Sequence, residues 1–174
     1  MRIFAPARFL DQSTQPHIAT LIALASISAL AMNIFLPSLP SMAAYYNTTP
    51  SIMSLSVAIY LGASALLQLF SGPISDRIGR RPVILISLIL FIIASLATIW
   101  APNAETFLAL RFVQAFAATT MVLSRAVVRD TVGKDAAASK IAYVTMGMAV
   151  APMIGPGIGG YLDKYFGWQA IFVL

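Results

Sequence analysis

The chain has 174 residues, of which 59% are hydrophobic and only 10% are charged. A soluble domain carries about 25% charged residues, so this composition excludes an ordinary water-exposed fold and predicts an all-α membrane protein in a lipid bilayer. The net charge of +5 does not indicate a nucleic-acid partner, because Lys and Arg gather at the ends of apolar segments. With no Cys and a single His, the sequence predicts no disulfide, no metal site and no cofactor.

Five apolar segments are long enough to cross a bilayer, which takes roughly 20 helical residues. They cover residues 18–39, 52–74, 82–100, 106–128 and 138–161. A sixth segment begins at residue 167 and stops at residue 174, so we expect an incomplete, truncated sixth helix. Residues 1–16 are expected to form a cytoplasmic N-terminal tail, and residues 17–174 a single transmembrane bundle.

Basic residues mark one side of the membrane, and the opposite side has only Lys164. They precede the first span, separate the second from the third, and separate the fourth from the fifth: Arg2, Arg8, Arg77, Arg80, Arg81, Arg129, Lys134 and Lys140. The positive-inside rule therefore predicts a cytoplasmic N-terminus. A cleaved signal peptide is the alternative, but the first apolar segment is too long for one.

Polar side chains follow one face of the first two spans. Asn33 shares a helical face with Ser26, and Gln68 shares one with Tyr60 and Ser64. Such residues line a cavity or bond to neighbouring helices, and the spacing leaves both interpretations open. Asn33 and Gln68 are candidates for a substrate cavity.

The densest charge cluster joins the second and third spans, in the run Gly72-Pro-Ile-Ser-Asp-Arg-Ile-Gly-Arg-Arg81. Its two glycines permit a tight turn and close backbone approach, and its Asp can pair with Arg. A plain solvated turn is the alternative. The pattern G-x-x-x-D-R-x-G-R-R resembles the signature loop of the major facilitator superfamily of transporters. The resemblance implies a conformational switch that favours the outward-facing state, made of Gly72, Asp76, Arg77, Gly79, Arg80 and Arg81.

Arg111 lies within the fourth apolar segment, where a guanidinium costs about 2.5–3.5 kcal/mol at a helix centre. Gln114 is three positions further on and shares its face. Snorkelling to the outer surface is the alternative, and we favour a buried pair that faces a polar cavity. The run from Arg111 to Ala115 resembles the superfamily's fourth-helix motif R-x-x-Q-G, associated with proton coupling, with Ala in place of Gly.

The fourth span ends with Arg129 and Asp130. A basic residue is favourable at a helix C-terminus because of the helix dipole, and that explanation is sufficient by itself. The resemblance adds both residues to the switch and implies that Arg80 pairs with Asp130.

Small residues recur every four positions from Gly147 to Gly159, which predicts a flat face for close packing in the fifth span. Pro152 and Pro156 are expected to interrupt its backbone hydrogen bonds. A plain packing seam is one interpretation. The run Gly155-Pro-Gly-Ile-Gly-Gly160 also resembles the core of the superfamily's antiporter motif, which implies export. The motif positions are Gly155, Pro156, Gly159 and Gly160.

The run Met32-Asn-Ile-Phe-Leu-Pro-Ser-Leu-Pro40 resembles the drug:proton antiporter branch with bicyclomycin-resistance-like exporters, although Asn33 replaces an expected Asp. These resemblances imply the N-terminal six-helix bundle of a bacterial inner-membrane exporter, which moves small drug-like molecules against protons and lacks its C-terminal bundle. An enzyme is not expected, because the acidic residues fall near helix ends. The alternative is a truncated fragment that cannot transport. If this fragment is a monomer, we expect that Asp76 and the small-residue face of the fifth span have no partner to bind.

Overall fold

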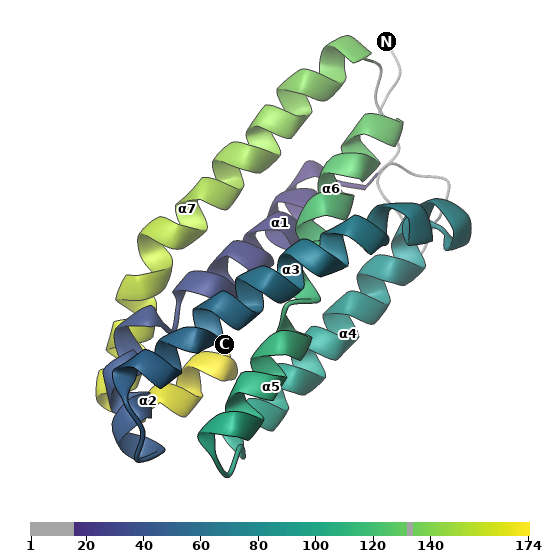
Figure 1. The fold of residues 1–174 in the computed structure, drawn as a ribbon. Coiled ribbons are helices and arrows are strands. Elements are labelled where there is room, and N and C mark those ends of the chain that lie inside the picture. Colours follow the sequence, from purple (N-terminus) through teal and green to yellow (C-terminus); the bar gives the residue numbers. More distant parts are fainter. Residues whose placement is uncertain (1–15, 132–133) are drawn as a thin grey trace.

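The computed structural model describes residues 16–131 and 134–174, with side chains described outside residues 131–136. Every regular element within these ranges is helical. Among the described residues, five helical segments are long and apolar enough to cross a membrane. Figure 1 shows the long helices running along one common axis. The fold is therefore an all-α membrane bundle, as the sequence predicts.

The first predicted span, residues 18–39, covers α1 (Ile18–Asn33) and the 3₁₀ helix η1 (Leu36–Ser38), and ends where α2 (Leu39–Tyr45) begins. The α-helix is thus broken directly after Asn33, although the apolar pattern runs on to residue 39. Pro37 explains the break, because a proline has no N–H to donate and its ring clashes with the carbonyl four residues earlier, here that of Asn33.

The basic run between the second and third spans is mostly helical. α3 (Pro50–Ile78) and α4 (Arg80–Ile99) are joined by Gly79 alone, whose φ of +97° favours glycine. The expected close backbone approach at Gly72 is wrong, because a Cβ built on this residue would meet no other group within 4 Å. Only Gly79 is needed for the turn itself.

A second break divides the fourth predicted span into α5 (Ala104–Gln114) and α6 (Ala117–Thr131). At this break the N–H groups of Ala115 and Phe116 donate to carbonyls three residues back, at 3.3 and 3.1 Å. The surrounding sequence has neither Pro nor Gly, so it gives no signal for the break. Ala115 is fully buried and belongs to one cluster with Tyr60.

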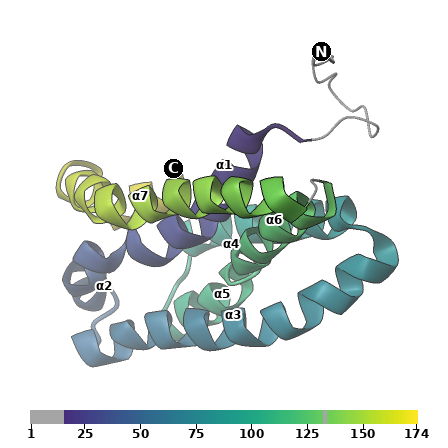
Figure 2. The same ribbon diagram turned by 90° about the horizontal axis from the view of Figure 1, so that it is seen from above.

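The fifth predicted span is α7 (Lys134–Phe166), and residues Trp168–Phe172 form the 3₁₀ helix η2. α7 continues through Pro152 and Pro156, so the prolines do not break it. The predicted start of a sixth α-helix is instead this 3₁₀ turn. Figure 2 shows α7 and α3 on opposite sides of the bundle, with α1 and α6 between them.

α1 is the partner of the small-residue face of α7. A Cβ added to Gly147 would overlap the side chain of Ile22, and one on Gly155 would stand 3.1 Å from Leu30 Cδ1. Small residues thus let the two helices approach closely. The expectation that this face has no partner within the chain is wrong, because the partner helix lies in the same bundle.

Aromatic rings pack together at the end of the bundle where α2, α5 and η2 meet. The Trp168 ring lies 5.6 Å from that of Tyr46 and 6.3 Å from that of Phe107, measured between ring centroids. These contacts join η2 to the end of α2 and the start of α5. The hydroxyl of Tyr46 donates to the carbonyl of Ala101 at 3.3 Å, which adds a contact to the segment before α5.

The contact between α7 and α1 is tested by two matched substitutions. Gly159→Ala is expected to destabilise the bundle, because the new methyl group would overlap the carbonyl oxygen of Ile34. Overpacking of this kind typically costs about 1–3 kcal/mol. Gly157→Ala is the control, since a Cβ there meets nothing within 4 Å, and Ala favours a helix over Gly by up to about 1 kcal/mol.

The measurement is the free energy of unfolding of both variants in detergent micelles. Equal stability of the Gly159→Ala and Gly157→Ala proteins would contradict the close contact.

Candidate functional site

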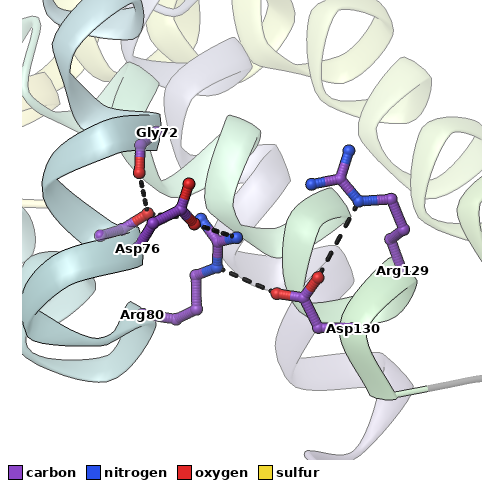
Figure 3. Close-up of polar contacts among 6 residues, drawn as sticks. Gly72, Asp76, Arg80, Arg129 and Asp130 are labelled. Atoms are coloured by element: carbon purple, nitrogen blue, oxygen red, sulfur yellow. Dashed lines mark hydrogen bonds and ion pairs between the residues drawn. The ribbon is translucent and has the colours of Figure 1, made fainter.

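Three charged residues meet where α3 turns into α4 (Figure 3). Arg80 Nη2 lies 2.6 Å from Asp76 Oδ1, and Arg80 Nε lies 3.0 Å from Asp130 Oδ2. The same guanidinium also donates to the hydroxyl of Ser75. Arg80 therefore links α3, α4 and α6. The predicted pairing of Arg80 with Asp130 is confirmed, whereas the expectation that Asp76 has no partner is wrong.

The cluster is solvated and readily broken. The Asp76 and Asp130 side chains are 61% and 44% exposed, against 21% for Arg80. Exposed ion pairs are each worth about 0–1 kcal/mol, so this network can separate at little cost. That property suits a contact which forms in one conformation and opens in another.

The other basic residues of the predicted switch are outside this cluster or at its edge. Arg77 and Arg81 are exposed and take part in none of the ion pairs between described side chains. Arg129 lies 3.9 Å from Asp130 and is 72% exposed. The positive-inside rule is sufficient to explain Arg77 and Arg81, and only Arg80 joins the three helices.

A second polar cluster lies in the bundle interior, where Arg111 and Gln114 are both fully buried. Arg111 Nη1 donates to Gln114 Oε1 at 2.6 Å, and Gln114 Nε2 donates to Thr98 Oγ1 at 3.0 Å. The buried Arg–Gln pair that the spacing predicts is present. The sequence did not identify Thr98, on α4, as the next member of this chain of hydrogen bonds.

Arg111 has no carboxylate partner among the described residues. Both of its terminal nitrogens donate to the carbonyl of Ala31, at 3.3 Å each. Its guanidinium carbon stands 4.1 Å from the centre of the Phe35 ring and 4.8 Å from that of Tyr60. A carbonyl, an amide and two aromatic faces thus replace the counter-ion.

The four predicted cavity residues do not come together. Arg111 and Gln114 line a cavity of about 210 Å³ whose other walls are mainly apolar side chains of α1, α4 and the C-terminal residues. Asn33 is outside this lining, and its amide nitrogen donates to the carbonyl of Ala29 at 2.7 Å on its own helix. Gln68 is half-buried on α3 and is also outside the lining.

The predicted antiporter motif lies against the broken part of α1. Gly155 and Gly159 are buried there, and a Cβ on Gly160 would stand 3.6 Å from the Pro37 ring. Pro156 is half-buried within the same turn of α7. The glycines therefore serve close packing of α7 on α1.

Comparison with known proteins agrees with this architecture. Residues 21–174 match the family model of the Major Facilitator Superfamily. The chain belongs to this superfamily. It is 37% identical over 150 residues to a chloramphenicol resistance protein of Pseudomonas aeruginosa, covering 84% of this chain and 35% of that protein.

Two further relatives carry similar names. A bicyclomycin resistance protein homolog of Haemophilus influenzae is 35% identical over 93% of this chain and 41% of its own length. Multidrug resistance protein D of Escherichia coli is 30% identical over 88% of this chain and 39% of its own length. The chain thus spans well under half the length of these curated relatives.

The Arg80 cluster predicts a measurable coupling between helices. In a double-mutant cycle of Arg80→Ala with Asp130→Asn, the free energies of unfolding are expected to be non-additive by about 0.2–1 kcal/mol, the range of exposed ion pairs. The same cycle with Arg77→Ala is the control and is expected to be additive, because Arg77 is not paired with Asp130 in the structure. Additivity in both cycles would show that Arg80 does not hold α6.

Proposed function

We propose that the protein exports small drug-like molecules across the bacterial inner membrane in exchange for protons, by alternating access of two helical bundles. The observation that carries this proposal is membership of the superfamily together with relatives named for chloramphenicol, bicyclomycin and multidrug resistance. The buried Arg111–Gln114 pair supports it, because a charge is retained inside a membrane bundle mainly where it serves a pathway or site.

Within this proposal Arg111 and Gln114 form the polar part of the cavity wall, and Asn33 and Gln68 contribute where the two bundles meet. Arg111 influences proton coupling through its charge and does not itself carry the proton, since a guanidinium stays protonated at any physiological pH. Asn33 cannot titrate either. The acidic side chains described are Asp76, Glu105, Asp130 and Asp163, which all lie near helix ends.

The Arg80 cluster serves as the switch in this cycle. Its contacts join α3, α4 and α6 at one end of the bundle and lie in solvent, where they break easily. Formation of the cluster would favour the outward-facing state, and its loss would favour the opposite one. Asp76 contributes to the cluster from α3 and pairs with Arg80, the residue that begins α4.

The switch predicts that Asp76→Asn abolishes most drug export while membrane insertion is retained, because an amide removes the charge that attracts Arg80 and keeps the shape. The measurement is drug accumulation in cells that express the protein as its natural gene encodes it. The amount of each variant in the membrane fraction is quantified in parallel. Glu105→Gln is the matched control: Glu105 is an exposed acid at the opposite end of the bundle, in the first turn of α5. Export at the wild-type level by the Asp76→Asn protein would reduce the cluster to a structural contact.

Orientation is tested with single cysteines on one helix, and the native chain has no Cys background. Ser51 and Ile78 are both exposed, near opposite ends of α3. We expect an impermeant thiol reagent to label Ser51→Cys in intact cells, and Ile78→Cys only after the cells are opened. The reason is the excess of Lys and Arg at the Ile78 side. Labelling of Ile78→Cys in intact cells would reverse the proposed topology.

A further inference from the structure

The break in α1 leaves backbone carbonyls without helical partners. The last four carbonyls of any α-helix lack an intrahelical donor, and in α1 these belong to residues 30–33. The carbonyl of Leu30 accepts the N–H of Ile34 at 2.9 Å. The carbonyl of Ala31 accepts both terminal nitrogens of Arg111. Arg111 therefore caps the broken end of α1 from another helix.

Electrostatics favours this position for the cation. The C-terminus of a helix carries about half a negative elementary charge from its aligned peptide dipoles. Arg111 is fully buried, so water does not screen this attraction. The partial negative charge at the end of α1 therefore compensates part of the positive charge of Arg111, as a carboxylate would otherwise do.

The same guanidinium holds the chain on both sides of the break. Its hydrogen bonds reach Ala31, which precedes the break, and it stacks on Phe35, which follows it. Tyr60 covers it from α3 and is itself fixed to α1, since its hydroxyl donates to the carbonyl of Ser28 at 3.2 Å. Gln114 and Thr98 anchor the guanidinium towards α4.

α7 contacts the break through a different surface. Gly159 lies so close to the carbonyl oxygen of Ile34 that an added Cβ would overlap it. Residues 34 and 35 are thus held between Arg111 on α5 and Gly159 on α7. Neither contact follows from the separate motifs, because these lie far apart in the sequence.

We propose that residues 34–35 form a hinge in α1, which Arg111 locks from α5 and Gly159 supports from α7. Arg111 is a positioning residue in this device: when its guanidinium leaves the Ala31 carbonyl, the angle between α1 and α2 changes and α7 shifts with it. Asn33, the last residue of α1, moves with the hinge. This role goes beyond the proposed transport function and holds for any substrate.

The test measures the distance across the hinge with two spin labels. Ala19 on α1 and Ala44 on α2 are both exposed, and labels on Ala19→Cys and Ala44→Cys report the angle between the helices in the full chain in lipid nanodiscs. With Arg111 present we expect one narrow distance distribution. Arg111→Gln is expected to add a second population at another distance, because the amide removes the charge that caps α1. Arg111→Lys is expected to restore the main population, since an ammonium can still cap a helix C-terminus.

Thr98 supplies a milder pair of variants for the case in which Arg111→Gln does not fold. Thr98→Val removes the hydroxyl that accepts a hydrogen bond from Gln114, so a second, smaller population of distances is expected. Thr98→Ser keeps the hydroxyl and is expected to show the main population alone. Glu105→Gln is the control for unspecific change. An unchanged distribution in Arg111→Gln, or in Thr98→Val where the first variant does not fold, would overturn the hinge. The same broadening in Glu105→Gln would overturn it equally, by showing that the effect is not local.

Discussion

The arrangement of this bundle depends on Arg111, a cation that is buried without a counter-ion among the side chains described. An uncompensated charge within a membrane segment costs about 2.5–3.5 kcal/mol at the helix centre, and the structure offsets this cost with dipoles and rings. The Ala31 carbonyl, the Gln114 amide and the faces of Phe35 and Tyr60 surround the guanidinium of Arg111. The Ala31 carbonyl is free for this contact because α1 is broken, since an unbroken helix would use that carbonyl internally.

The two polar clusters differ in how easily they can change. Around Arg80 the charges are partly solvated, and a pair of that kind contributes about 0–1 kcal/mol. Around Arg111 the charge and its Gln114 partner are fully buried, and a hydrogen bond to a charged group contributes about 1.5–3 kcal/mol. The contacts of the first cluster can therefore open and close at little cost, whereas the second keeps its geometry unless something replaces its partners. This difference supports the proposed switch at the bundle end and a fixed arrangement of polar groups in its interior.

Sequence patterns predicted the helical class, the apolar segments and the Arg111–Gln114 pair, because hydrophobicity and helical spacing act locally. The break after Asn33 can be traced to Pro37. The break at Ala115 could not be found, because no Pro or Gly lies near it; in the fold Ala115 packs against Tyr60 and Ala63 of α3, which a local pattern does not indicate. Likewise the small-residue face on α7 was visible in the spacing, but its partner α1 was not, since periodicity indicates which face packs and not what it packs against.

Two of the sequence motifs come together at one short segment of backbone. The run from Arg111 to Gln114 and the run from Gly155 to Gly160 are separated by the whole of α6 and nearly two thirds of α7. Yet the first binds the carbonyl of Ala31, and the second lies against that of Ile34. Because a packed interior changes between discrete arrangements and does not deform continuously, the proposed hinge would couple the two motifs through residues 31–35. The physical link between a buried charge on one helix and a glycine face on another is therefore the broken end of α1, which neither motif contains.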